Sequence, residues 1–84
     1  MKLRVYSVRD RLTGFMTPTL DQSDSSAIRN FSMACDVGKR DTSLIAFRPA
    51  DFSLYHVADF DTESGFVTSV VPLEFICSGD SLKE

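Results

Sequence analysis

Hydrophobic and polar residues alternate most regularly between Pro49 and Val71, which predicts two β-strands joined by a tight turn. Residues 61–65, Asp-Thr-Glu-Ser-Gly, supply the turn, and residues 66–71 form the returning strand. Simple alternation in the first strand predicts one row of side chains that faces the core: Phe52, Leu54, His56, Ala58 and Phe60. We expect this hairpin to be the centre of the fold.

Residues 2–9 alternate as well and predict a strand with both faces partly covered. The turn signal at 10–14 sends the chain back into a short strand over 15–19. Pro18 ends that strand or confines it to a sheet edge, because proline cannot donate a ladder hydrogen bond. The two faces of the first strand are expected to carry Leu3 and Val5 on one side, and Arg4, Tyr6 and Val8 on the other.

Apolar residues recur at helical spacing in one segment, at Ala27, Ile28, Phe31, Ala34 and Cys35. Ser23 or Asp24 is a good N-cap, so the pattern predicts a helix from about Asp24 to Val37 that stops at Gly38. The apolar residues 44–47 form either a short strand or a buried loop segment.

This order of elements, β-β-α-β-β, predicts an α+β fold: a small antiparallel sheet of about four strands, covered on one face by a single helix. Residues 70–77 are apolar and extended, and Pro72 places them at an edge or a bend. We expect one domain over residues 1–77 and a flexible tail over 78–84. The strands carry more apolar residues than one helix covers, so a homodimer or higher homo-oligomer is expected, joined by sheet face or edge.

Charge divides the 84 residues into two halves. Residues 1–48 hold eight basic and five acidic residues (+3), and residues 49–84 hold one basic and seven acidic residues (−6), which gives the net charge of −3. The basic half would suit phosphate or the acidic half of a second copy. The two cysteines, Cys35 and Cys77, are too few for a disulfide framework and are expected to be reduced. With no signal peptide and no membrane-length apolar run, a cytoplasmic protein is expected.

Enzyme chemistry finds little support in the sequence. His56 is the single histidine, and no nucleophile motif accompanies it, so a structural or interface role is expected. A hard cation could bind Asp59, Asp61 and Glu63, but acidic residues are ordinary in a turn. The four glycines are isolated and form no phosphate loop. We therefore expect no catalysis, no metal and no cofactor.

Cations beside aromatic rings on a strand are typical of surfaces that bind single-stranded nucleic acid, where bases stack on the rings. This pattern occurs in the basic half, which also contains Phe15. The alternative is an ordinary solvated face with scattered charges. The candidate nucleic-acid-binding residues are Lys2, Arg4, Tyr6, Arg9, Arg11 and Arg29.

Three segments also carry a family resemblance: residues 5–10 (Val-Tyr-Ser-Val-Arg-Asp), residues 27–31 (Ala-Ile-Arg-Asn-Phe) and, above all, residues 49–61 with Gly65 in the turn. Together they resemble the small nonstructural protein of gokushovirus-type microviruses, tailless bacteriophages with circular single-stranded DNA genomes. The chain departs from that family at Ala58, where members commonly have glycine.

The resemblance implies a non-enzymatic protein that binds single-stranded DNA in the host bacterial cytoplasm. It would act in viral DNA replication and in the switch to genome packaging. The family contributes no catalytic residues and no defined DNA-contact motif. The alternative is a protein-interaction module that docks on the phage replication initiator or on a host replication factor without contacting DNA. A small hydrolase or metal-dependent nuclease that uses the acidic turn is the third and weakest reading.

Overall fold

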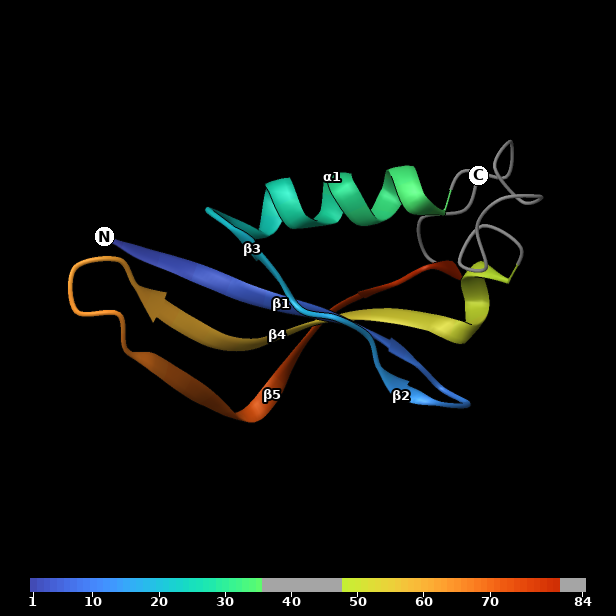
Figure 1. Ribbon diagram of the computed structural model, residues 1–84. Helices are drawn as coiled ribbons and strands as arrows, with labels where there is room; N and C mark the ends of the chain where they lie inside the picture. Colours follow the sequence, from blue (N-terminus) through green and yellow to red (C-terminus); the bar gives the residue numbers. More distant parts are fainter. Residues whose placement is uncertain (36–47, 81–84) are drawn as a thin grey trace.

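The computed structural model describes residues 1–35 and 48–80, which form one antiparallel sheet and one α-helix (Figure 1). The sheet has five strands in the order β2-β1-β4-β5, with β3 also paired to β1. This confirms the predicted α+β architecture. The elements are β1 (Lys2–Asp10), β2 (Gly14–Phe15), β3 (Thr19–Asp21), α1 (Asp24–Ala34), a single 3-10 turn (Pro49–Asp51), β4 (Phe52–Asp61) and β5 (Val67–Ser78).

The core lies between α1 and the face of the sheet that the helix covers (Figure 1). Tyr6 and Phe52 are the largest fully buried side chains. The sequence predicts more apolar strand residues than one helix can cover. Two of these residues, Tyr6 and Val8, nevertheless pack in the core beneath the helix. The buried cluster is completed by Ala27, Phe31, Cys35 and Leu54, with Ile28, Ile76 and Cys77 packed against it.

Helix α1 begins at the predicted cap. The Ser23 hydroxyl oxygen accepts a hydrogen bond from the backbone N–H of Ser26 at 3.3 Å, which satisfies one of the first-turn donors. The helix ends at Ala34, and Cys35 is its C-cap. The predicted end at Val37, the stop at Gly38 and the apolar segment 44–47 lie outside the described residues.

Two strand predictions needed correction. Residues 15–19 are predicted as one returning strand, but β2 ends at Phe15, and Thr19–Asp21 pairs with β1 as a separate strand, β3. Residues 66–71 and 70–77 were treated as separate segments, but Val67 to Ser78 is one edge strand that contains Pro72. Beyond it, the Gly79 N–H donates to the Phe52 carbonyl at 2.8 Å, and residues 81–84 of the predicted tail are not described.

The register of β1 on β4 changes in the middle of the sheet. Val5 pairs with Ala58 and Tyr6 pairs with His56, so Val57 is an extra residue on β4. A one-residue bulge exchanges the faces of all later side chains. The prediction that Ala58 and Phe60 share one face with Phe52, Leu54 and His56 is therefore wrong, although Ala58 is buried as expected, at 8% exposure.

The β4–β5 turn forms as predicted. Gly65 has a positive φ of 79° and donates its N–H to the Asp61 carbonyl at 2.8 Å. The Glu63 N–H donates to the Asp61 carboxylate at 2.9 Å, and this bond lowers the pKa of that carboxyl group. The acidic residues of the turn are thus used in an ordinary Asx-type connection.

We expect Ser23→Ala to lower the free energy of unfolding by about 1 kcal/mol, because it removes the helix cap. Ser25→Ala is the matched control in the same first turn, where the exposed hydroxyl makes no comparable bond, and its effect should stay within about 0.5 kcal/mol. Urea denaturation measures both. Equal effects of the two substitutions would show that the cap does not stabilise the helix.

Candidate nucleic-acid interface

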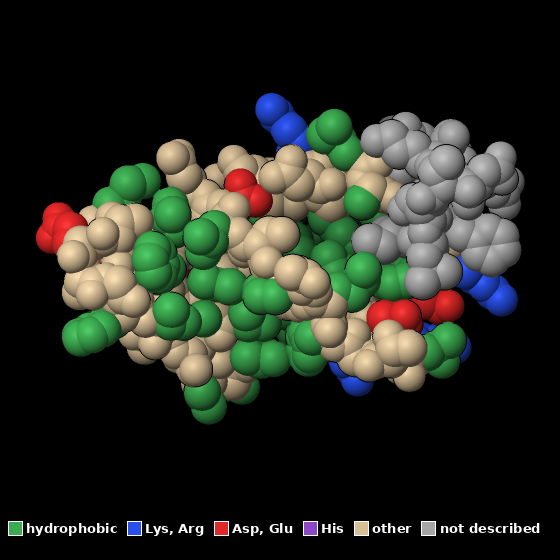
Figure 2. Space-filling model, viewed as in Figure 1, with side chains coloured by type: hydrophobic (Ala, Val, Ile, Leu, Met, Phe, Trp, Pro, Cys, Tyr) green, Lys and Arg blue, Asp and Glu red, His purple; other side chains and the backbone are tan. Residues whose placement is uncertain are grey.

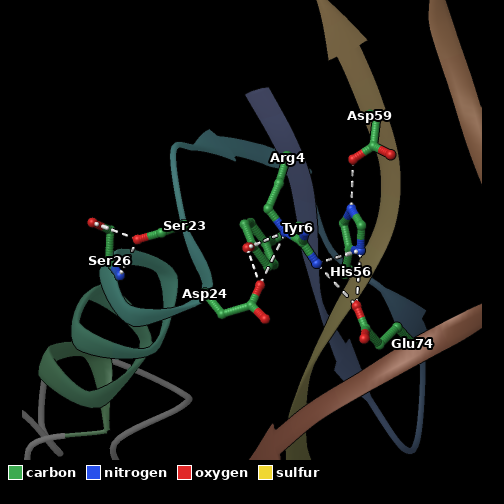
Figure 3. A network of polar contacts seen from close by, with 8 residues as sticks. All are labelled: Arg4, Tyr6, Ser23, Asp24, Ser26, His56, Asp59 and Glu74. Carbon is green, nitrogen blue, oxygen red and sulfur yellow. Dashed lines mark hydrogen bonds and ion pairs between the residues drawn. The ribbon is translucent and has the colours of Figure 1, made fainter. Parts of the chain in front are cut away.

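A polar network joins the helix to three strands beneath the N-terminus of α1 (Figure 3). Its centre is the Arg4 guanidinium. The Arg4 Nε lies 3.0 Å from the Tyr6 hydroxyl and 3.0 Å from the Asp24 carboxylate, and its Nη2 lies 3.0 Å from Glu74 Oε1. Burial tends to lower the pKa of Arg4, but the Tyr6 hydrogen bond and the charges of Asp24 and Glu74 outweigh it, so the pKa is raised.

The buried His56 ring bridges two acidic residues of this network. Its Nε2 is 2.8 Å from Asp59 Oδ1, and its Nδ1 is 3.0 Å from both Glu74 Oε1 and Arg4 Nη2. A carboxylate can only accept, so Nε2 carries a proton. Nδ1 accepts from Arg4 when the ring is neutral and donates to Glu74 when it is protonated. The β4 bulge makes this arrangement, because it turns Asp59 to the same face as His56.

Tyr6 is the most deeply buried member of the network, with 1% of its surface exposed. Its hydroxyl donates to the Asp24 carboxylate and accepts from Arg4. Burial first, and then the bond to Asp24, raise the pKa of Tyr6 to about 12. This hydroxyl therefore stays protonated and links β1 to the first turn of α1.

His56 faces carboxylates and a guanidinium, with no serine or cysteine nucleophile in hydrogen-bond contact. Both cysteines are free thiols, and burial raises the pKa of Cys35 and of Cys77. No group of three possible metal ligands comes together among residues 1–35 and 48–80. The arrangement fits a structural clamp between helix and sheet.

Two of the predicted nucleic-acid contacts belong to this clamp. The Tyr6 ring is covered by the helix, so the prediction that it offers a surface for base stacking is wrong. The Arg4 guanidinium is already held by two carboxylates and Tyr6. Strand periodicity placed both residues on one face correctly, but it could not show that the helix packs on that face.

The four remaining cations do not form one patch. Lys2 pairs with Asp61 at one end of the sheet, and Arg9 lies near the other end, about 23 Å along the strand. Arg11 follows β1 and forms an ion pair with Asp51 at 3.2 Å. Arg29 is exposed on α1. Of the predicted set, Arg9 and Arg11 are the two that lie near each other in the sequence and at the same end of the sheet.

The face of the sheet opposite α1 carries a row of aromatic rings. Phe15, Tyr55 and Phe75 come from β2, β4 and β5, with ring centroids 5.5 Å and 5.6 Å apart and edge-to-face geometry. Phe15 is 48% exposed and Phe75 is 56% exposed. The small side chain of Ser7, on β1 between them, leaves room for the Phe15 and Tyr55 rings to meet. We call these three rings the aromatic row.

Arg9 lies beside the aromatic row, because it pairs with Phe15 on β2 and with Ser53 on β4. A shallow apolar depression of about 310 Å³ continues the surface along the sheet. Its lining consists of Ser7, Phe15, Met16, Pro18, Val57 and Leu73. The sequence analysis noted Phe15 as a candidate aromatic but missed Tyr55 and Phe75. Alternation in β4, which places Ser53, Tyr55 and Val57 opposite the core row, could have identified Tyr55.

Strand pairing separates the charges of the sheet by face, since residues directly opposite each other share a face. Arg9 is the one charged side chain that the described strands place on the open face. The acidic strand residues all lie on the helix side, at Asp10, Asp21, Asp59, Asp61 and Glu74. The open face is therefore apolar and aromatic with a single positive charge, despite the net charge of −3.

Comparison with known proteins supports the bacteriophage part of the family resemblance. A family model described as Phage ORF5 protein matches residues 3–82. This chain belongs to the Phage ORF5 protein family. No curated protein and no solved structure matches it. Within the described part of this Phage ORF5 protein, no helix is long and apolar enough to cross a membrane.

The clamp predicts a loss of stability at alkaline pH. An unfolded tyrosine ionises near pH 10, whereas the pKa of Tyr6 in the folded chain is about 12. Because the folded state holds this proton more tightly, the stabilisation is complete below pH 10 and is lost as the pH rises to about 12. Tyr6→Phe should cost about 1.5 kcal/mol at pH 8, the value of a hydrogen bond to a charged group.

The measurement is urea denaturation of wild type and Tyr6→Phe between pH 8 and pH 12. Subtracting the two unfolding free energies at each pH removes the contribution of other titrating groups. The difference in unfolding free energy between wild type and Tyr6→Phe should shrink through this range. A difference that stays constant with pH would contradict the proposed coupling of the Tyr6 hydroxyl to Asp24.

Proposed function

We propose that this phage protein is a non-enzymatic single-stranded DNA-binding protein, and that its aromatic row is the surface on which bases stack. The observation that carries the proposal is the row of Phe15, Tyr55 and Phe75 on an open sheet face beside Arg9. Phosphates would contact Arg9 and Arg11. This set replaces Arg4 and Tyr6, which the clamp occupies.

The chemistry of the open face suits single strands better than duplex. An exposed ring accepts any base, and each base-aromatic stack contributes about 1–3 kcal/mol. The edge-to-face packing leaves the two outer rings half exposed, so they are available to bases on either side of Tyr55. The acidic residues of the described strands lie on the other face, so they repel phosphate less than they would on the open face.

Few cations accompany the rings, so binding would depend on stacking more than on charge. A protein that neutralises only one or two phosphates loses little affinity as the salt concentration rises. For single strands, the logarithm of the binding constant falls with the logarithm of the salt concentration with a slope of about −0.7 for each phosphate contacted. This explains how a chain with net charge −3 could still bind DNA. It would discriminate against duplex DNA, whose bases are not free to stack.

The resemblance to the small nonstructural protein of gokushovirus-type microviruses supplies the biological setting of this proposal. The protein would act in the cytoplasm of the infected bacterium. There it would hold newly made single strands during viral DNA replication and in the switch to genome packaging, with the phage replication initiator as a possible partner.

Substitution of the two outer rings tests the proposal. Phe15→Ala and Phe75→Ala should each weaken binding of a short labelled oligothymidine about 5- to 100-fold, the loss expected from one stack. Met33→Ala is the matched control, since Met33 is similarly exposed but lies on α1. Arg9→Ala should reduce the salt slope by about 0.7. Fluorescence anisotropy at several salt concentrations measures all four variants.

Undetectable binding of wild type at micromolar protein and low salt would overturn the proposal. The protein would then be read as an interaction module that docks on the initiator or on a host replication factor. A pull-down from infected cells separates the two readings: nuclease treatment should release the partners of a DNA-binding protein and should leave those of a docking module bound.

A further inference from the structure

The half of the open face nearest the β4–β5 turn differs from the half that carries the aromatic row. Five large apolar residues are cross-strand neighbours there, on β1, β3, β4 and β5: Leu3, Val5, Leu20, Phe60 and Val67; Ala58 and Ser69 share the same face. Leu20 is 52% exposed and Val67 is 64% exposed. We call these five residues the hairpin-end surface. Figure 2 shows hydrophobic side chains spread over this half of the molecule.

The hairpin-end surface has the composition of an interface core. Its five side chains are all apolar, and the neighbouring Ser69 adds a polar but uncharged group. Charged residues are depleted at the centres of protein interfaces. Two further apolar side chains on the same hairpin, Phe66 and Val71, are even more exposed. Soluble monomers rarely expose contiguous apolar patches of this kind without a function. Helix α1 packs on the opposite face, against Tyr6 and Leu54.

Nucleic acid is a poor occupant for this surface. None of the five residues can contact phosphate, and the adjacent turn carries Asp61 and Glu63. The aromatic row and Arg9 lie toward the other end of the sheet. The sheet is strongly twisted (Figure 1), so the two halves of its open face turn in different directions.

The charges around the surface fit a second copy of this chain. The end of the surface at the β4–β5 turn holds both signs, because the Met1 ammonium group lies 3.7 Å from Glu63 and both groups are exposed. In a two-fold dimer each residue of one copy meets a different residue of the other. A border with both signs is then self-complementary, because the exposed Met1 ammonium of each copy can face Glu63 of its partner.

Joining the sheets by their edges is disfavoured, which leaves the face. The edge strand β5 contains Pro72, and its register with β4 shifts twice, features that discourage strand addition. On the other edge, β2 has two residues and β3 has three. A chain of 84 residues also has a thin margin of stability, which burial of an apolar face would increase.

We propose that two copies of the protein associate through the hairpin-end surface across a two-fold axis. The aromatic row of each copy lies outside this contact. A dimer would therefore present two separate rows, and a longer strand that reached both would bind more tightly than a short one by avidity. The association itself does not depend on DNA binding.

Light scattering after size-exclusion chromatography tests the proposal on the full chain. Wild type at about 100 µM should have twice the 9.4 kDa mass of one chain. Val67→Asp and Leu20→Asp place a buried, unpaired charge at the contact and should raise the dimer dissociation constant at least tenfold, which gives the single-chain mass. Met33→Asp, a change of equal chemistry at an exposed position on α1, should remain a dimer.

Circular dichroism tests whether each variant keeps its fold. The milder substitution Val67→Ser provides a second variant at the same position and should weaken association less than Val67→Asp. A single-chain mass for wild type overturns the proposal. A dimer that persists in the folded Val67→Asp and Leu20→Asp variants also overturns it. A dimer that dissociates in Phe75→Asp but not in Val67→Asp overturns it as well, because the contact would then lie on the aromatic row. Binding of a short oligothymidine is measured separately. If wild type does not bind it, the proposed function is contradicted, whereas the dimer mass measured by light scattering is unaffected.

Discussion

One extra residue in β4 determines how the sheet distributes its side chains. Because Val57 is unpaired in the register between β1 and β4, Asp59 turns to the helix side and meets His56, while Ala58 and Phe60 turn to the open side. Without the bulge, Asp59 would lie among apolar residues and Phe60 would compete for space in the polar clamp. The bulge therefore produces both the polar network under the helix and the mainly apolar face on the other side.

The polar clamp has a second consequence for function. Arg4 joins β1 to the first turn of α1 through Asp24 and to the edge strand through Glu74. These partners neutralise its charge inside the molecule, and the Tyr6 ring that accompanies it lies beneath the helix. The most conspicuous cation and aromatic pair of the first strand thus holds the fold together. The surface available to a ligand is the opposite face, where rings are exposed and acidic groups are absent from the described strands.

Sequence periodicity predicted the hairpin, its turn, the first strand, the helix and its cap at Ser23, because each depends on local preferences. It failed where a non-local register decided the outcome. The alternation from Phe52 to Phe60 continues through the bulge without a visible break, since Val57 and Ala58 are both apolar. The partners of Arg4 and Tyr6 could not be foreseen because Asp24 and Glu74 are distant in sequence. The aromatic row likewise gathers residues from three separate segments, although the exposed side of β4 gave a signal for Tyr55.

The proposed function gives the two faces of the sheet separate roles, a structural one beneath the helix and a binding one on the open side. Photo-cross-linking to an oligonucleotide that carries iodouracil, with the linked peptides mapped by mass spectrometry, tests this division most directly. The account predicts cross-links at Phe15, Tyr55 and Phe75. Cross-links confined to Tyr6 or to residues of α1, with none on the aromatic row, would contradict it.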